Sequence, residues 1–293
     1  MGGDDEAAAK AAVLIESLPW LKRFSGQTIV IKFGGNAMVD RDLKRAFAED
    51  IAYLQLVGVR PVVVHGGGPQ ISARLAELGI ESEFVGGYRV TTPEVMTVTK
   101  EVLSGQLSVE LADLISEHGD DLGVVVVEGM FTGVKRGAVV DGELVDIGLV
   151  GDVTDVDTAA VLRVLEHGGV PVVSSLAHDA DGQLLNVNAD SAAAALAIAL
   201  NAAKLVVLTD VAGLYSDWPD RESLVSVIAV DELRELLPSL ESGMIPKMTA
   251  CLDAVEGGVA KAAIIDGRVP HGILLEVFTT GGIGTEVVPD GMA

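Results

Sequence analysis

Residues 28–36 read Thr-Ile-Val-Ile-Lys-Phe-Gly-Gly-Asn, and residues 61–69 read Pro-Val-Val-Val-His-Gly-Gly-Gly-Pro. In each stretch a run rich in β-branched residues ends in glycines. Apolar residues at helical spacing follow each run, over residues 40–57 and 69–78. Alternating strands and helices of this kind indicate a parallel sheet. Because parallel strands are buried on both sides, the pattern predicts helices on both faces of that sheet.

The same alternation continues toward the C-terminus. Strand-like runs occur at Val124–Val127, Pro171–Val173, Leu205–Leu208 and Ala260–Ile265, and helical segments at 157–167, 189–200 and 247–257. Residues 130–146 differ, because short alternating segments with turns at Gly137 and Asp141-Gly142 predict a β-hairpin beside the main sheet. The fold class predicted from these patterns is α/β, with a mainly parallel open sheet.

The first 24 residues form a separate unit. Residues 6–18 are rich in alanine and predict a helix, Pro19 is expected to interrupt it, and residues 20–24 lead to the first strand. The segment Gly2-Gly3-Asp4-Asp5-Glu6 lacks the basic and apolar regions of a signal peptide. We therefore expect a cytoplasmic protein.

Composition excludes several classes of protein. Of the 293 residues, 49% are hydrophobic, which is enough for a large core. No apolar run approaches the roughly 20 residues of a membrane span. The formal net charge is −23 without a basic stripe, which argues against nucleic-acid binding. The single cysteine, Cys251, excludes an internal disulfide and a cysteine-based metal cluster, and we expect a buried, inert thiol.

Two glycine turns follow predicted strands, where ligands bind in such sheets. In the first, Lys32 precedes Gly34-Gly35, so an ammonium group adjoins backbone N–H groups that can bind an anion. In the second, Gly66–Gly68 precede a helix that begins near Pro69, and the helix N-terminus favours an anion. A solvent-facing lysine and a turn required only for packing remain the alternatives. Neither turn matches a Walker loop, and His65 is either a packed histidine or a base.

Further polar residues stand where helices begin. Asn188 is a plausible N-cap, which leaves Asn186 free to donate to a carboxylate. Asp190 falls in the first helical turn, where the helix dipole alone would favour it. Lys247 also lies near a helix start, where a cation is unfavourable unless an anion binds it. Arg89 follows a glycine pair and either clamps a carboxylate or lies on the surface.

Taken together, these motifs resemble those of the N-acetyl-L-glutamate kinases in the amino-acid-kinase family. The matching stretches are Lys32–Met38 (KFGGNAM), Val63–Ile71 (VVHGGGPQI), Gly87–Thr91 (GYRVT), Pro171–Ser175 (PVVSS), Gln183–Asp190 (QLLNVNAD), Leu208–Tyr215 (LTDVAGLY) and Gly243–Lys247 (GMIPK). The resemblance implies a three-layer α/β/α sandwich. It also implies an acetylglutamate-binding lobe over residues 25–200 and a lobe over residues 201–293 that binds ATP with Mg²⁺, the metal being held mainly by the nucleotide.

The resemblance also implies a reaction and roles for individual residues. The reaction is ATP-dependent phosphorylation of the γ-carboxylate of N-acetyl-L-glutamate to N-acetyl-L-glutamyl 5-phosphate, in arginine biosynthesis. Lys32 and Lys247 would neutralise the transferring phosphoryl group, and Asp190 would hold both lysines. The substrate would be bound by Gly67, Gly68, Arg89 and Asn186. The nucleotide would be bound by Gly34, Gly35, Asp210, Val211, Ala212, Gly213, Leu214, Tyr215, Ser239, Leu240 and Glu241.

Residues 261–285 resemble the C-terminal signature of the arginine-sensitive members, which implies feedback inhibition by L-arginine. The implied arginine-binding residues are Trp20, His271, Glu276 and Gly282. Ala263 stands where many relatives have histidine, and Trp20 where many have tyrosine. Arginine-regulated members use an N-terminal helix to join dimers, so residues 1–24 imply a homohexamer assembled as a trimer of dimers.

Other functions remain open at this point. Within the same family, the chain could phosphorylate glutamate, aspartate, carbamate or a nucleoside monophosphate. A dinucleotide-dependent oxidoreductase is disfavoured because no GxGxxG motif occurs. An arginine sensor without catalytic activity is disfavoured because Lys32, Lys247 and Asp190 are all present.

Overall fold

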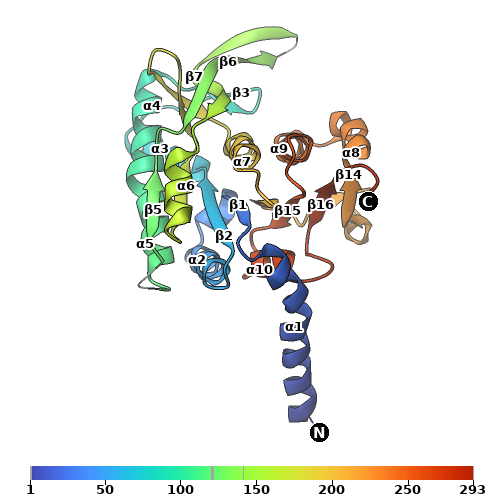
Figure 1. The fold of residues 1–293 in the computed structure, drawn as a ribbon. Coiled ribbons are helices and arrows are strands. Elements are labelled where there is room, and N and C mark those ends of the chain that lie inside the picture. The colour runs from blue at the N-terminus through green and yellow to red at the C-terminus, as the bar shows by residue number, and fades with distance from the viewer. Residues whose placement is uncertain (1, 120–121, 141, 293) are drawn as a thin grey trace.

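The computed structural model describes residues 2–119, 122–140 and 142–292, and it is organised around one eight-stranded sheet. The strand order is β14-β16-β15-β11-β1-β2-β8-β5, with β1 and β2 near the centre (Figure 1). In order across the sheet, the bounds are Val227–Ala229, Thr285–Val288, Ala262–Asp266, Lys204–Thr209, Thr28–Phe33, Arg60–His65, Val170–Ser174 and Val124–Val127. Every neighbouring pair is parallel except β15 and β16. The predicted α/β class and mainly parallel sheet are therefore confirmed.

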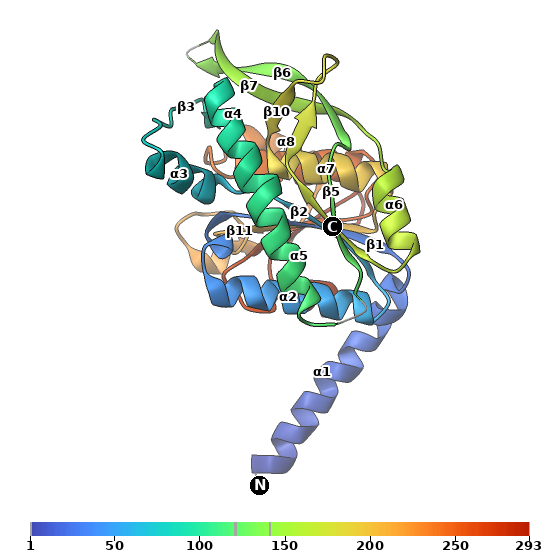
Figure 2. The ribbon, with the colours of Figure 1, turned by 90° about the vertical axis from the view of Figure 1, so that its left-hand side faces the viewer.

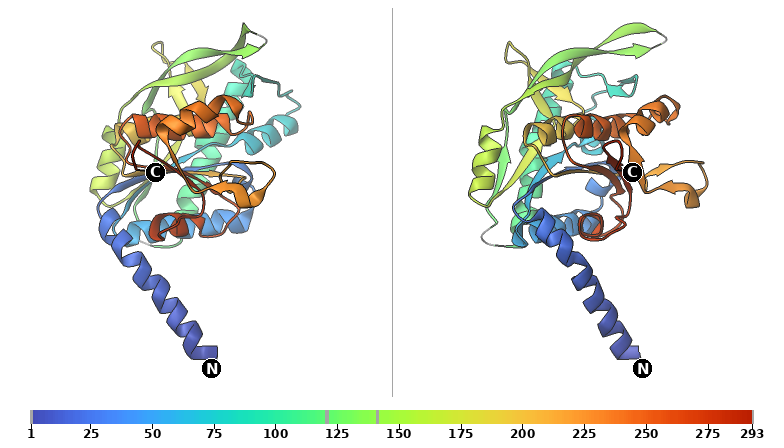
Figure 3. Two further views of the ribbon diagram at one scale, coloured as in Figure 1. Left: turned by 90° about the vertical axis from the view of Figure 1, so that its right-hand side faces the viewer. Right: turned by 45° about the vertical axis from the view of Figure 1, so that its right-hand side comes forward.

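Helices cover both faces of the sheet (Figures 1 and 3). One face carries α2 (Arg41–Leu56), α3 (Gly68–Glu77), α4 (Pro93–Lys100), α5 (Ser108–Ser116) and α10 (Gly272–Phe278). The other carries α6 (Ala159–Glu166), α7 (Ala189–Ala199), α8 (Val230–Leu236) and α9 (Ile245–Glu256). The helices predicted from periodicity match α2, α3, α6, α7 and α9 within a few residues.

The central strand explains why both faces are apolar. In β1, Ile29, Ile31 and Phe33 belong to the core under α2 and α10, whereas Val30 belongs to the core under α7 and α9. Successive side chains of a strand point to opposite faces, so a strand buried on both sides must be apolar at every position. Lys32 interrupts this run and is itself buried. A lysine at that position requires a partner.

The segment 93–116 was not predicted from the sequence, and it forms one long helical stretch. Helices α4 and α5 lie end to end in Figure 2, joined by a π-helical segment over Glu101–Leu107. In a π-helix each N–H donates to the carbonyl five residues earlier, so each turn is wider than an α-helical turn. Such segments are uncommon and often lie at functional sites.

A second group of strands stands above the main sheet (Figure 1). It contains β6 (Phe131–Val140), β7 (Glu143–Val156), β9 (Leu176–His178) and β10 (Leu184–Val187). The predicted hairpin is confirmed as the antiparallel pair β6–β7. The turn predicted at Gly137 is wrong, because Gly137 lies inside β6, where the pairing register shifts at a bulge. Of the other predicted turn, Asp141 lies outside the described residues.

Short elements complete the fold. The hairpin β3–β4 (Phe84–Val85 and Tyr88–Arg89) contains Arg89, and β12 (Leu214–Tyr215) pairs with β13 (Leu224–Val225). The 3₁₀ helices are η1 (Gly35–Met38), η3 (Arg221–Ser223) and η4 (Leu237–Ser239). No helix among the described residues has the length and hydrophobicity needed to span a bilayer.

Helix α1 spans Gly2–Phe24 and projects from the body of the molecule (Figures 1 and 3). The expected interruption at Pro19 is therefore wrong. Proline removes one helical hydrogen bond, the one that would reach the carbonyl of Ile15. Both residues are exposed here, so water can satisfy that carbonyl, and the helix continues.

A buried carboxylate joins α2 to the start of α10. Asp50 is almost fully buried, and its Oδ1 lies 2.7 Å from Nδ1 of His271. Burial raises the pKa of Asp50 from 3.8 to about 6, although the hydrogen bond and charge of His271 lower it. Because the folded-state pKa lies above the unfolded value, this group favours folding most at low pH. That contribution is lost as the pH rises through about 6.

We expect Asp50→Asn to remove this pH dependence, because an amide does not ionise. The free energy of unfolding of the variant, relative to wild type, should increase between about pH 4 and pH 6 and level off above that range. Urea unfolding at a series of pH values measures this difference. The matched control is Asp155→Asn, at an exposed carboxylate. The raised pKa of Asp50 would be contradicted if the free energy of unfolding of Asp50→Asn, relative to wild type, changed with pH no more than that of Asp155→Asn.

Candidate active site

The two glycine turns predicted to bind anions lie side by side. Strands β1 and β2 are parallel neighbours with Phe33 opposite His65, so Gly34-Gly35 and Gly66–Gly68 leave the same edge of the sheet. They border a cleft of about 900 Å³ that is open to solvent. Lys32, Arg89, Asn186 and Asp190 also line this cleft. Four segments far apart in sequence therefore meet at the carboxyl ends of the central strands, where α/β sheets bind ligands.

One carboxylate holds both candidate lysines. Oδ1 of Asp190 lies 2.8 Å from Nζ of Lys32, and Oδ2 lies 3.4 Å from Nζ of Lys247. The Lys32 and Asp190 side chains are only 8% and 5% exposed, whereas Lys247 is 24% exposed and lies nearer solvent. Burial alone would raise the pKa of Asp190, but the two ammonium charges outweigh burial and lower it. The cluster thus holds two positive charges and one negative charge.

Helix starts bring these groups together. Asn188 caps α7 as predicted, because its side chain accepts from the N–H groups of Asp190 and Ser191. This cap fixes Asp190 in the first turn of α7, where the helix dipole favours a carboxylate. Lys247 lies in the first turn of α9, after Pro246. A cation there is unfavourable for the dipole of α9, and Asp190 supplies the compensating charge.

The first glycine turn leaves no space for side chains. A Cβ on Gly34 would lie 2.7 Å from Nζ of Lys32. Gly35 has a positive φ of 71°, and a Cβ there would lie 3.0 Å from Oδ1 of Asp210. Asp210 accepts from the backbone N–H and the side-chain amide of Asn36, both at 3.1 Å. Asp210 therefore fixes this turn to the end of β11.

Arg89 is a buried cation without a carboxylate partner among the described residues. Its guanidinium donates to the carbonyl of Gly68 at 3.0 Å and to Oγ of Ser72 at 2.8 Å, and it also contacts Ser82. Asn186 donates to Oγ1 of Thr91 at 3.2 Å. Because Arg89 and Asn186 both line the cleft, their arrangement suits an anionic ligand such as a carboxylate.

The second glycine turn supplies backbone donors. Gly67 caps α3, and Gly68 is its first residue, so their N–H groups have no acceptor within the helix. No other described residue accepts from them. The turn thus presents the N–H groups of Gly67 and Gly68 to the cleft, as the sequence predicted, whereas the N–H of Gly66 donates to the carbonyl of Phe33 at 3.2 Å.

A second pocket, of about 770 Å³, lies beyond β11. It is lined by most of the predicted nucleotide-binding residues, together with Ser216, Trp218, Leu236 and Met244. The predicted residues at this pocket are Val211, Gly213, Leu214, Tyr215, Ser239, Leu240 and Glu241. Ala212 does not line it, and Asp210 binds Asn36 instead.

The predicted arginine-binding residues are only partly brought together. Trp20, Glu276 and Gly282 line one pocket beside α1, and Oε2 of Glu276 accepts from the N–H of Ile283 at 2.9 Å. His271 is not among its lining residues, because its ring is bound to Asp50 on α2. Ala263 is buried within β15.

Three further charged residues of this pocket, Lys204, Lys261 and Glu286, were not predicted from the sequence. Nζ of Lys204 lies 2.7 Å from Glu276 and 2.9 Å from Glu286, and Lys261 also pairs with Glu286. Lys204 directly precedes the apolar run Leu205–Leu208. A lysine at the start of a buried strand could have indicated that it has a charged partner.

Two further predictions concern single residues. Cys251 is fully buried, as predicted, and burial raises the pKa of its thiol strongly. His65 is also fully buried, which matches the packed-histidine alternative, and burial lowers its pKa to about 4. Among the described residues, no group of three His, Cys, Asp or Glu side chains could hold a metal ion.

This chain matches one protein family over most of its length and is similar to known members of it. The model of the amino acid kinase family matches residues 27–266. Acetylglutamate kinase of Leifsonia xyli subsp. xyli is 66% identical over 287 residues, covering 97% of this chain and 95% of that protein.

Two solved structures are also similar. N-acetylglutamate synthase of Neisseria gonorrhoeae, complexed with coenzyme A and N-acetyl-glutamate, is 27% identical with a TM-score of 0.82. The match covers 96% of this chain but only 64% of that longer chain. The same synthase complexed with coenzyme A and L-arginine is 26% identical, with a TM-score of 0.81 over 96% of this chain and 65% of that one.

We expect Asp190→Ala to destabilise the fold, because it leaves two ammonium groups without their shared counter-ion. Removing one partner of a buried ion pair costs about 3–5 kcal/mol of unfolding free energy. The control is Asp152→Ala, which removes an exposed carboxylate 2.7 Å from Arg136 and should cost less than about 1 kcal/mol. Urea unfolding measures both values. Equal losses in the two variants would contradict the buried pair at Asp190.

Proposed function

This chain belongs to the amino acid kinase family and is a phosphotransferase, and we propose that it phosphorylates the γ-carboxylate of N-acetyl-L-glutamate with ATP. The product is N-acetyl-L-glutamyl 5-phosphate, an intermediate of arginine biosynthesis. The observation that carries the proposal is the pair of lysines on Asp190, at the cleft between two glycine turns. The choice of N-acetyl-L-glutamate as the substrate is supported by the relatives named acetylglutamate kinase.

The chemistry requires two anions to meet. A carboxylate is already a nucleophile at neutral pH, so the reaction needs no general base. Catalysis of phosphoryl transfer then consists mainly of positioning and charge stabilisation. Because Lys32 and Lys247 share one carboxylate, the cluster keeps a net positive charge for the incoming phosphoryl oxygens. The N–H groups of Gly67 and Gly68 donate to the same region.

Arg89 and Asn186 are proposed to bind the α-carboxylate of the substrate. Arg89 is held rigidly by Ser72 and the carbonyl of Gly68, so little side-chain entropy is lost when a carboxylate binds. Its lack of a carboxylate partner among the described residues supports this role. A buried guanidinium without a counter-ion is costly, and the substrate supplies one.

The nucleotide is proposed to occupy the pocket between Tyr215 and Leu240, with its phosphates reaching Gly34 and Gly35. Residues 25–200 then form the acetylglutamate lobe and residues 201–293 the ATP lobe. Mg²⁺, when bound, would neutralise charge on the phosphates. Because Mg²⁺ usually binds substrate phosphates and keeps several waters, we propose that the nucleotide would hold it mainly.

Regulation by L-arginine is a separate proposal. The pocket of Trp20, Glu276 and Gly282 contains two carboxylates, Glu276 and Glu286, which can bind a cationic amino acid by exchanging their present partners Lys204 and Lys261. A structurally similar synthase has been solved with L-arginine. His271 is proposed to act only indirectly, through α10, because it binds Asp50.

Helix α1 is proposed to join dimers into a hexamer. Its apolar residues Val13, Leu14 and Ile15 are 56%, 68% and 68% exposed, and helix surfaces of this kind pack against partners. Because α1 also borders the pocket at Trp20, assembly and arginine binding would be linked. The chain is proposed to act in the cytoplasm.

The substrate is tested by initial rates of ADP release with N-acetylglutamate, glutamate, aspartate and carbamate side by side. We expect activity with N-acetylglutamate to exceed the others, and Lys32→Ala or Lys247→Ala to lower kcat by about 10²–10³. The control is Lys100→Ala, which lies outside the cleft. A lysine variant that raises only KM would contradict a role in the transition state. A preference for another phosphoryl acceptor would contradict the proposal that N-acetylglutamate is the substrate.

We expect L-arginine to inhibit the full-length enzyme, and deletion of residues 1–24 to weaken inhibition, spare basal activity and convert hexamers to dimers. Glu276→Ala should also weaken inhibition, whereas the exposed control Glu232→Ala should not. Initial rates against arginine concentration and light scattering measure these effects. Insensitivity of the full-length enzyme to about 10 mM arginine, where even a ~4 kcal/mol binder would register, would contradict the regulatory proposal.

A further inference from the structure

His65 ends β2 and makes two polar contacts inside the core. Its Nδ1 lies 2.9 Å from the carbonyl oxygen of Gly66, and its Nε2 lies 2.7 Å from Oγ of Ser108. The ring does not line the cleft. The proposed reaction needs no base, so the chemistry leaves this histidine without a direct role.

The two contacts determine where the imidazole carries its proton. A carbonyl oxygen can only accept, so the nitrogen facing Gly66 must be N–H. Burial keeps the ring neutral at neutral pH, with a pKa of about 4. Nε2 is then an acceptor, and Ser108 must donate to it. The hydrogen bonds therefore run in one direction, from Ser108 through His65 to the carbonyl of Gly66.

The geometry of the peptide bond transmits this contact to the cleft. In a planar trans peptide, the C=O and the following N–H point in opposite directions. Because the carbonyl of Gly66 points to His65, the N–H of Gly67 points away from the ring. Gly66 and Gly67 line the cleft, whereas His65 does not. Glycine itself does not restrict this peptide, so the orientation must be held from outside.

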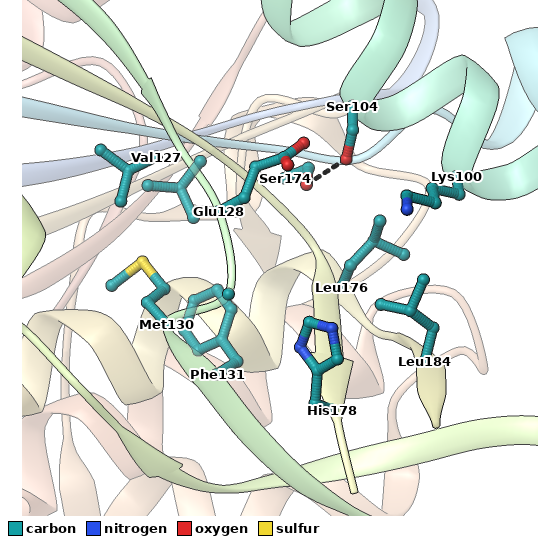
Figure 4. Close-up of a pocket in the computed structure, with 12 residues that line it drawn as sticks. Lys100, Ser104, Val127, Glu128, Met130, Phe131, Ser174, Leu176, His178 and Leu184 are labelled. Atoms are coloured by element: carbon teal, nitrogen blue, oxygen red, sulfur yellow. Dashed lines mark hydrogen bonds between the residues drawn. The ribbon is translucent and has the colours of Figure 1, made fainter. Parts of the chain in front are cut away.

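Ser108, the first residue of these contacts, directly follows the π-helical segment. The carbonyl of Leu103 accepts from the backbone N–H of Ser108, five residues later, so the single hydroxyl proton of Ser108 remains for His65, although Oγ also lies 3.0 Å from that carbonyl. A Cβ added to Gly67 would overlap the side chains of Leu103 and Leu107, so the segment packs directly on the glycine backbone. The same segment also contacts β8, the neighbour of β2, where Oγ of Ser104 lies 3.4 Å from Oγ of Ser174 (Figure 4).

We propose that His65 and Ser108 are positioning residues that orient the Gly66–Gly67 peptide, so that the N–H of Gly67 is directed at the charge that develops on the phosphoryl-acceptor side of the cleft. This inference rests on the proposed kinase function. A preorganised donor is effective because it need not reorient during the reaction. His65 does not act as a general base, since both ring nitrogens are bonded inside the protein.

Two amide variants separate the contacts. In His65→Asn the amide nitrogen can occupy the position of Nδ1 and donate to Gly66, whereas in His65→Gln it reaches the position of Nε2 and Ser108. We expect His65→Asn to keep kcat within about fivefold of wild type, and His65→Gln to lower it by about 10- to 100-fold, less than the loss of a whole donor. KM for ATP should change little in either. The control is His167→Gln, at an exposed histidine.

Equal kcat losses in the two amide variants, or losses confined to KM, would overturn the proposal. Ser108→Ala provides a milder test, because it removes only the hydroxyl that selects the tautomer. We expect it to lower kcat by about 2- to 10-fold. Wild-type kcat in Ser108→Ala would overturn the role of Ser108.

Crystal structures of the two amide variants give a readout that needs no substrate. The carbonyl of Gly66 should keep its orientation in His65→Asn and rotate in His65→Gln, and an unchanged carbonyl in His65→Gln would overturn the proposal. If the wild-type enzyme does not phosphorylate N-acetylglutamate, the proposed function fails. The carbonyl orientation still decides whether His65 positions the peptide.

Discussion

The buried carboxylate of Asp190 is the group on which the rest of the site depends. Two lysines from opposite ends of the chain, at the end of β1 and the start of α9, meet on this one side chain. Without it, two ammonium groups would repel each other in a region of low dielectric constant, where such energies are several-fold larger than in water. The cap at Asn188 fixes the position of Asp190, and the order of the strands brings Lys32 beside it.

This local charge matters because the chain as a whole is strongly acidic, with a net charge of −23. An acidic surface repels anionic substrates at long range, although salt screens that repulsion beyond about 8 Å. Binding of two anions must therefore come from groups in the cleft or next to it. Lys32, Lys247, Arg89 and the glycine N–H groups provide them, and most are fixed by neighbours before any ligand binds.

Much of the fold could be predicted because strand and helix periods are local properties. The β-branched run at Thr28–Phe33 and the cap at Asn188 are examples. Contacts between distant residues could not be predicted in this way. The pairing of Lys204 with Glu276, of His271 with Asp50 and of His65 with Ser108 depends on how elements pack. The π-helical segment was missed for the same reason, and continuation of α1 through Pro19 depends on exposure to water.

The central claim is that the two lysines on Asp190 stabilise the transferring phosphoryl group rather than the bound nucleotide. Its most direct test is the affinity of wild-type enzyme and of Lys32→Ala for MgADP, with and without aluminium fluoride and N-acetylglutamate, measured by calorimetry. The fluoride complex imitates a planar phosphoryl group. We expect the variant to bind this complex about 10²–10³ times more weakly, while its affinity for MgADP alone stays within about threefold. Equal losses for both ligands would contradict the claim.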